Sequence, residues 1–255
     1  MDLLQALALL AAGMVAGAIN VIVGSGTLVT FPTLLAFGYP SVLANVSNTI
    51  GLVPGSVAGA IAYRRELREQ RERVLRLAGA STVGGITGAL VLLKLPSSAF
   101  DAIVPVLILL GCALVVAQPS LSGWVARRRT RSGTVGGSHG GVLTFVLVFF
   151  TGVYGGYFGA AQGVLLMAIM GILINDDLQR LNGVKNVLAG LVNFVAAIVF
   201  ILVSHVAWDA AALIAAGSTL GGTLGGRYGR RLPPQALRGF IVVVGLVAAV
   251  RLLAT

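Results

Sequence analysis

Ten apolar segments, separated by short polar connections, account for most of the chain. They run approximately over residues 3–23, 28–37, 42–63, 74–93, 99–117, 142–158, 164–174, 184–203, 210–226 and 237–253. Two of them, Leu28–Phe37 and Val164–Ile174, hold only about ten or eleven residues. At about 1.5 Å per residue, each covers roughly half of a 30 Å hydrocarbon core. We therefore predict that each is the second arm of a helical hairpin, folded back at a Gly-rich break.

The same order of features occurs twice along the chain. A long apolar segment enters a Gly-rich break, a short apolar segment follows, and the next segment begins with amide side chains. The first copy has its break at Gly17–Thr27 and its amides at Asn45–Thr49, and the second has them at Gly152–Gly163 and Asn182–Asn186. Paired breaks in corresponding positions of two halves are typical of a transporter's binding site. Unwound backbone is tolerated at membrane depth only where it is buried in protein or lines a cavity.

Arginines are concentrated in alternate connections, whereas the connections around Pro40, Pro96 and His205 carry almost no cations. The positive-inside rule places the arginine-rich connections in the cytoplasm. The first hairpin then begins and ends outside, the second begins and ends inside, and three spans follow each. This arrangement predicts an inverted-topology repeat with both termini extracytoplasmic. The arginines of these connections are Arg64, Arg65, Arg68, Arg71, Arg73, Arg76, Arg127, Arg128, Arg129, Arg131, Arg180, Arg227, Arg230, Arg231 and Arg238.

The predicted fold class is an all-α polytopic membrane protein made of two inverted repeats. Repeat 1 covers residues 1–117, with a hairpin at 3–38 and spans at 42–63, 74–94 and 99–117. A flexible cytoplasmic linker, indicated by its Pro, Gly, Ser and Arg content, covers 118–141. Repeat 2 covers residues 142–255, with a hairpin at 142–175 and spans at 183–204, 209–226 and 237–253.

Composition agrees with a chain embedded in a bilayer. The 255 residues are 57% apolar and 10% charged, with a mean hydropathy of +0.96, whereas a soluble domain carries about 25% charged residues. The net charge of +10 resides in the connections, where it reports topology, so we do not predict nucleic-acid binding. Cys112 is the only cysteine, which rules out a disulfide within one chain.

No constellation of catalytic or metal-ligating residues is visible. His139 and His205 fall at segment ends, without metal-ligand spacing to another His, Cys or carboxylate. Gly24-Ser25-Gly26 lacks the lysine of a phosphate-binding loop and lies in a membrane hairpin. We therefore predict no catalytic residues, no metal site, no cofactor and no enzymatic activity.

The two breaks are the preferred candidates for a binding site. A break leaves free backbone N–H groups at the start of the short arm, at the positive end of a helix dipole, and such groups suit an anion. Close helix packing through small residues is the alternative, and we assign the scattered glycines such as Gly17, Gly88 and Gly221 to it. The candidate substrate-binding residues are Gly24, Ser25, Gly26, Thr27, Asn45, Asn48, Thr49, Gly159, Gln162, Gly163, Asn182, Lys185 and Asn186.

Amides and one lysine follow the breaks. Asn45 and Asn48 share a helix face, and Asn182, Lys185 and Asn186 repeat that spacing. Such amides line a cavity or bond between helices, and both interpretations stay open. Lys185 either snorkels to the cytoplasmic interface or faces an anion within the bundle, and we favour the anion.

On these residues the chain resembles the TauE/SafE family of sulfite and organosulfur-anion exporters, also called TSUP. The resemblance rests on Gly17, Gly24–Thr27, Pro32 followed by Leu34-Leu35, Ala44–Thr49, and the second copy over Gly152–Gly163. The family's glycine cluster is diluted here, and Ala168 stands in the second half where the first has Pro32. The resemblance implies a multi-pass transporter of the prokaryotic inner membrane, with sulfite, sulfonates or related small acids as substrates.

The sequence therefore predicts export of a small inorganic or organosulfur anion by alternating access. The alternatives are an uncoupled anion channel and a transporter of another small carboxylate or sulfur anion. An intramembrane enzyme or a metal-cation carrier would need a cluster of buried acidic, His or Cys residues. The expected partners are the anion and the lipid bilayer, and homodimer formation is left open.

Overall fold

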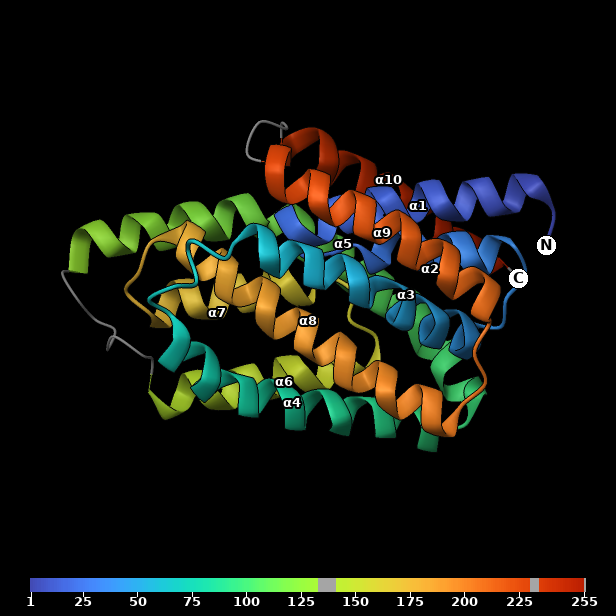
Figure 1. The fold of residues 1–255 in the computed structure, drawn as a ribbon, viewed down its shortest axis with the longest axis horizontal. Coiled ribbons are helices and arrows are strands. Elements are labelled where there is room, and N and C mark those ends of the chain that lie inside the picture. The colour runs from blue at the N-terminus through green and yellow to red at the C-terminus, as the bar shows by residue number, and fades with distance from the viewer. Residues whose placement is uncertain (133–140, 230–233, 255) are drawn as a thin grey trace.

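The structure, a computed structural model, describes residues 1–132, 141–229 and 234–254, apart from the side chains of a few helical residues in these ranges. Within them the chain forms ten α-helices and no strand, so the all-α fold class is confirmed (Figure 1). His139, Arg230 and Arg231 lie outside the described residues. The helices are α1 (Leu3–Ile22), α2 (Thr27–Ala36), α3 (Ser41–Ala62), α4 (Arg71–Lys94), α5 (Ser97–Ser132), α6 (Val142–Tyr157), α7 (Gln162–Leu173), α8 (Leu178–Val203), α9 (Trp208–Tyr228) and α10 (Pro234–Ala254).

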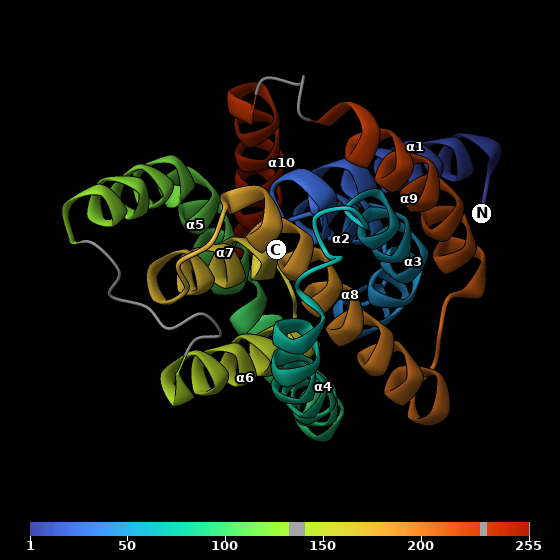
Figure 2. The same cartoon turned by 60° about the vertical axis from the view of Figure 1, so that its left-hand side comes forward.

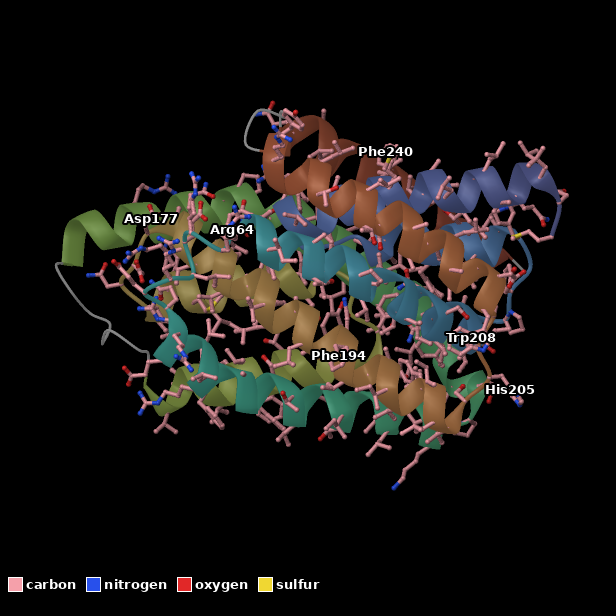
Figure 3. All side chains as sticks on the ribbon, in the orientation of Figure 1. Arg64, Asp177, Phe194, His205, Trp208 and Phe240 are labelled. Carbon is pink, nitrogen blue, oxygen red and sulfur yellow. The ribbon has the colours of Figure 1, made fainter. Side chains whose placement is uncertain are left out.

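The bundle has two ends of different character. Arg64, which follows α3, and Asp177, which precedes α8, lie together at one end, which we call the arginine end (Figure 3). His205 and Trp208, between α8 and α9, lie at the opposite end (Figure 3). Both chain termini lie at that opposite end (Figure 1), which we call the termini end. Because α3 ends where α8 begins, these two helices run in opposite directions.

Two helix pairs are broken hairpins. The 20 residues of α1 are followed by only 10 in α2, and the 16 of α6 by 12 in α7. The short arms are therefore about 15 and 18 Å long, roughly half the thickness of a hydrocarbon core. Gly38, just after α2, lines a pocket with Arg251 in the last turn of α10, so the first hairpin ends at the termini end, where α1 also begins.

Helix packing follows the same scheme in both halves. Helix α1 packs on α9 as α6 packs on α4, α3 packs on α9 as α8 packs on α4, and α2 packs on α10 as α7 packs on α5. Figure 2 shows the α1–α9 and α4–α6 pairs side by side on opposite sides of the molecule. The counterpart of each of α1 to α5 is the helix numbered five higher. Exchanging every helix with its counterpart gives the same six helix pairs.

Glycines make the closest of these packings. A Cβ on Gly17 would lie 2.2 Å from the carbonyl oxygen of Ser218, and one on Gly221 would lie 1.8 Å from that of Met14. A Cβ on Gly88 would lie 2.0 Å from a backbone oxygen of α6. The packing role predicted for these three glycines is therefore confirmed, because any side chain at these positions would separate the helices.

Five helices in the described part are long and apolar enough to cross a membrane: α1, α4, the Ser97–Leu121 part of α5, α8 and α10. Helices α3 and α9 have 22 and 21 residues but fall outside this set. Their amide, hydroxyl and glycine residues lower their hydropathy, and many of these are buried against neighbouring helices. The lower hydropathy of α3 and α9 therefore goes with contact to other helices.

Helix α5 is longer than the predicted span 99–117. It continues through Pro119 to Ser132, so the segment predicted as a flexible linker over 118–141 is helical in its first part. Residues 133–140 lie outside the described part. Proline is tolerated inside helices of membrane proteins because other groups satisfy the freed backbone carbonyl.

Candidate functional site

The first break ends α1 with a glycine in the left-handed region. The N–H groups of Val23 and Gly24 both donate to the carbonyl of Ile19, at 2.7 and 3.0 Å. Gly24 has a φ of +91°, a conformation that glycine adopts without the cost that a Cβ imposes. Three residues later, α2 begins at Thr27.

The second break repeats this geometry. The N–H groups of Phe158 and Gly159 both donate to the carbonyl of Tyr154, at 2.9 and 3.1 Å, and Gly159 has a φ of +77°. Three residues later, α7 begins at Gln162. The phenol of Tyr154 reaches into the break and donates to the carbonyl of Ala160 at 2.5 Å, which fixes the unwound backbone.

The two breaks touch each other. The N–H of Gly163, in the first turn of α7, donates to the carbonyl of Gly24 at 3.0 Å. A Cβ on either glycine would lie 2.5 Å from the Cα of the other. Rings from both halves also pack together, with Phe31 of α2 and Phe158 edge to face at a centroid distance of 5.1 Å.

Backbone N–H groups are left over at both breaks. Among the described residues, those of Ser25, Gly26 and Thr27 and those of Ala160 and Ala161 donate no hydrogen bond. All five residues are buried, and they stand at the start of the short arms α2 and α7. The positive ends of two helix dipoles therefore point into the region where the halves meet.

Lys185 of α8 reaches the same place. Its side chain is fully buried, and its ammonium donates to the carbonyls of Asn20 and Val21 in the last turn of α1, at 3.2 and 3.0 Å. Its stem passes Gly163, where a Cβ would lie 3.1 Å from the Lys185 Cδ. The lysine thus binds helix-end carbonyls that would otherwise lack partners. It does not snorkel to the interface, and no carboxylate forms an ion pair with it in the described structure.

Three further polar atoms near these residues are buried without a hydrogen-bond partner in the part of the chain that the structure describes. They are the hydroxyl of Ser25, the amide nitrogen of Gln162 and the amide nitrogen of Asn186. Each belongs to a residue adjacent in sequence to Gly24, Gly163 or Lys185, which meet. Unpaired buried polar groups are costly, and they are expected where a ligand or water supplies the partner.

Asn48 and Asn45 both make hydrogen bonds, although the amide oxygen of Asn45 is buried without a partner among the described residues. Thr30 of α2 donates to the amide oxygen of Asn48, and the amide nitrogen of Asn48 lies 3.5 Å from the Thr27 hydroxyl. Asn45 donates to the carbonyl of Tyr157 at 2.9 Å, which joins α3 to the end of α6. Thr49 is buried on α3, but no side-chain hydrogen bond joins it to the described break residues.

Asn182 lies apart from the breaks. Its amide donates to the phenol of Tyr63 at 2.8 Å, and Tyr63 directly follows α3, at the arginine end. The spacing of Asn182 from Lys185 gives the two a common helix face, yet one helical turn separates them in depth. The structure therefore does not bring Asn182 to the two breaks.

Sequence reasoning missed several polar residues around the breaks. Ser56 of α3 accepts from the amides of Asn20 and Asn193, at 3.4 Å each, and so joins α1, α3 and α8. Tyr154 and Tyr157 lie inside the Gly-rich motif itself. Ser56 could have been found from its position two turns after Asn48 on the same helix face. The tyrosines could have been found because a phenol between glycines is unusual in an apolar segment.

A buried ion pair joins the halves at the arginine end. Arg73 of α4 lies 2.5 Å from Asp176, which precedes α8, and their side chains are only 7% and 12% exposed. Gln70 donates to the same carboxylate at 2.9 Å. Burial alone would raise the pKa of the Asp176 carboxyl, but the hydrogen bonds from Arg73 and Gln70 outweigh it and lower this pKa.

Comparison with known proteins identifies the family. Residues 9–252 match the family model described as "Sulfite exporter TauE/SafE". A "Probable membrane transporter protein ORF9" of Sinorhizobium sp is 26% identical over 96% of this chain and 91% of its own. The "Probable membrane transporter protein YfcA" of Escherichia coli K12 is 27% identical over 94% and 86%.

A "Probable membrane transporter protein" of Haemophilus influenzae is 24% identical over 82% of this chain and 79% of its own. No solved structure matches the chain significantly. The family match spans both hairpins, both breaks and every helix that carries the polar residues described above. This chain belongs to the TauE/SafE family of membrane proteins.

Proposed function

We propose that this protein is a transporter that binds a small anion where the two breaks meet. The observation that carries the proposal is the fully buried Lys185, which has no carboxylate partner among the described residues. A buried ammonium without a counter-charge is expensive in a membrane protein, although the carbonyls of α1 offset part of that cost. A bound anion would supply the missing charge.

The surrounding donors suit an oxyanion. The free N–H groups at the starts of α2 and α7, the Gln162 amide and the Asn186 amide all donate and carry no negative charge. A small acid with several oxygen acceptors would engage more than one of them. The family description favours sulfite, and a sulfonate offers the same group of oxygens.

The transport mechanism in this proposal is alternating access, in which one half rocks against the other around a fixed site. Two features support an inverted repeat as its basis: the contact pattern that exchanges the halves, and the opposite directions of α3 and α8. The Arg73–Asp176 pair links α4 to the residues before α8 at the arginine end. Opening that end to the cytoplasm would require this pair to separate.

Counterflow into proteoliposomes tests the proposal. Vesicles preloaded with unlabelled sulfite should take up labelled sulfite in a saturable manner, and excess sulfate, thiosulfate, taurine or sulfoacetate would rank the substrates by competition. Saturable counterflow supports a carrier. A large, unsaturated conductive flux would instead indicate the uncoupled channel, and the absence of flux and binding for every anion would reject the proposal.

A further inference from the structure

A second candidate site lies at the arginine end, away from the breaks. A pocket of about 660 Å³ opens between the C-terminal ends of α3 and α9. Its walls within the helices are formed by small or apolar residues, and its rim is basic. The lining residues are Ala58, Ile61, Ala62, Arg64, Arg65, Glu66, Thr223, Gly226 and Arg227.

The rim holds three arginines and one carboxylate, which gives the lining a net charge of +2. Arg64, Arg65 and Arg227 are exposed and form no ion pair within the described residues. The guanidinium of Arg227 also lies 5.6 Å from the ring centroid of Tyr228. Figure 3 shows Arg64 at the arginine end, directly after α3.

An exposed apolar surface leads from the rim toward the middle of the bundle. Val57 and Ile61 of α3 are 52% and 56% exposed, and Leu220 and Leu224 of α9 are 53% and 49% exposed. These residues precede the arginines by one or two turns on their helices, so they lie at hydrocarbon depth when the arginines lie at the interface. The pocket therefore combines an apolar lower wall with cations at the level of lipid phosphates.

We propose that this pocket binds one anionic phospholipid from the cytoplasmic leaflet. Its phosphate would be held by Arg64, Arg65 and Arg227, and an acyl chain would lie along the exposed side chains of α3 and α9. Basic pockets between transmembrane helices on the cytoplasmic side hold such headgroups. A soluble anion has the same charge but gains nothing from the apolar wall, so the pocket fits a lipid better than a soluble anion.

Native mass spectrometry of detergent-purified protein tests this site with three probes: phosphatidylglycerol, zwitterionic phosphatidylcholine and soluble glycerol phosphate. The pocket variant is Arg64→Gln/Arg65→Gln/Arg227→Gln. Its matched control is Arg68→Gln/Arg71→Gln/Arg76→Gln, which removes the same charge from exposed positions of the same end outside this pocket. Each arginine near a phosphate strengthens binding by roughly fivefold.

The pocket variant should bind phosphatidylglycerol at least about tenfold more weakly than the wild type, and the control should stay within about threefold. Equal losses in both variants would show general surface attraction and overturn the proposal. Binding of glycerol phosphate as tight as that of the lipid would overturn the lipid assignment. If the triple variant fails to elute as a single folded species, Arg227→Gln alone should weaken lipid binding by about fivefold, and unchanged binding would overturn the proposal.

Discussion

Gly24 and Gly163, from opposite halves of the chain, are in direct backbone contact. The N–H of Gly163 donates to the Gly24 carbonyl at 3.0 Å, and neither position has room for a side chain. This contact brings the two helix breaks together and places Lys185 beside them. The proposed anion site depends on it.

Adding a methyl group at this contact should destabilise the protein. Gly163→Ala places a Cβ 2.5 Å from the Gly24 Cα, and overpacking of this kind costs about 1–3 kcal/mol. Thermal unfolding in detergent measures the effect. The control is Gly79→Ala, a helical position with no atom within 4 Å of the added Cβ. Equal melting temperatures for the two variants would argue against a tight contact.

Gly24→Ala should be worse than Gly163→Ala, because it adds backbone strain to the clash. The comparison is Gly38→Ala, which has a similar φ of +84° but open space around its Cβ, so it reports the strain alone, about 1–2 kcal/mol. The difference between the melting temperatures of Gly24→Ala and Gly38→Ala isolates the clash. No difference between them would mean that the two halves separate easily here.

Asn186 and Asn48 should respond differently to removal of their amides. Asn186→Ala deletes an unpaired buried group, so stability should be kept while anion affinity falls by about tenfold. Asn48→Ala removes the acceptor of the Thr30 hydroxyl and leaves this buried group with only the Gly26 carbonyl at 3.5 Å, which costs about 1–3 kcal/mol. Thermal unfolding and anion titration on both variants give the answer. A stable Asn48→Ala beside an unstable Asn186→Ala would reverse these assignments.

Asp176→Asn should destabilise the arginine end by about 3 kcal/mol, because it removes the negative charge that is paired with the buried Arg73. The pKa of Asp176 is lowered in the folded state, so its stabilisation is complete above its ordinary value near 3.8 and is lost as the pH falls below it. Melting temperatures of wild type and variant should therefore begin to converge as the pH falls below about 4, and should meet only below the lowered pKa of the folded state.

The matched control for that experiment is Glu69→Gln. Glu69 pairs with Arg180 on the surface, where their side chains are 74% and 38% exposed, so its loss should change stability by less than about 1 kcal/mol. If Asp176→Asn melts like Glu69→Gln at neutral pH, the buried pair does not hold the arginine end closed.

Both termini should face the extracytoplasmic side, because they lie opposite the arginine end, which holds the arginine-rich connections. Fusions of a reporter that is active only in the periplasm should work at the N-terminus and at the C-terminus, while the same reporter after Arg68 should be inactive. An active reporter after Arg68 together with inactive reporters at both termini would show that the topology is the reverse of the one predicted.

Much of the fold could be predicted because its signals are local. The Gly-rich breaks interrupt apolar runs, and Gly24 and Gly159 occupy the positive-φ positions that end α1 and α6. The predicted end of α5 was wrong. We expected the helix to end before Pro119, but helices of membrane proteins tolerate proline, and α5 continues to Ser132.

The site was less predictable because its contacts are long-range. Lys185 donates to backbone carbonyls. Because every residue has a backbone carbonyl, the sequence could not indicate which ones would accept these hydrogen bonds. Arg73 was one of six arginines in a single connection, and nothing distinguished the one that pairs with Asp176. Asn182 shares a helix face with Lys185, but periodicity defines a face and not a depth, and the amide instead holds Tyr63.

The most direct test is a titration of purified wild type, Lys185→Met and Lys94→Met with sulfite. If sulfite does not bind to the wild type, the organosulfonates are titrated instead. Lys94 is the only other lysine and is exposed at the end of α4. Wild type and Lys94→Met should bind one anion saturably, while Lys185→Met, still folded by its melting curve, should bind at least about tenfold more weakly. Equal affinity in all three proteins would contradict an anion site where the breaks meet.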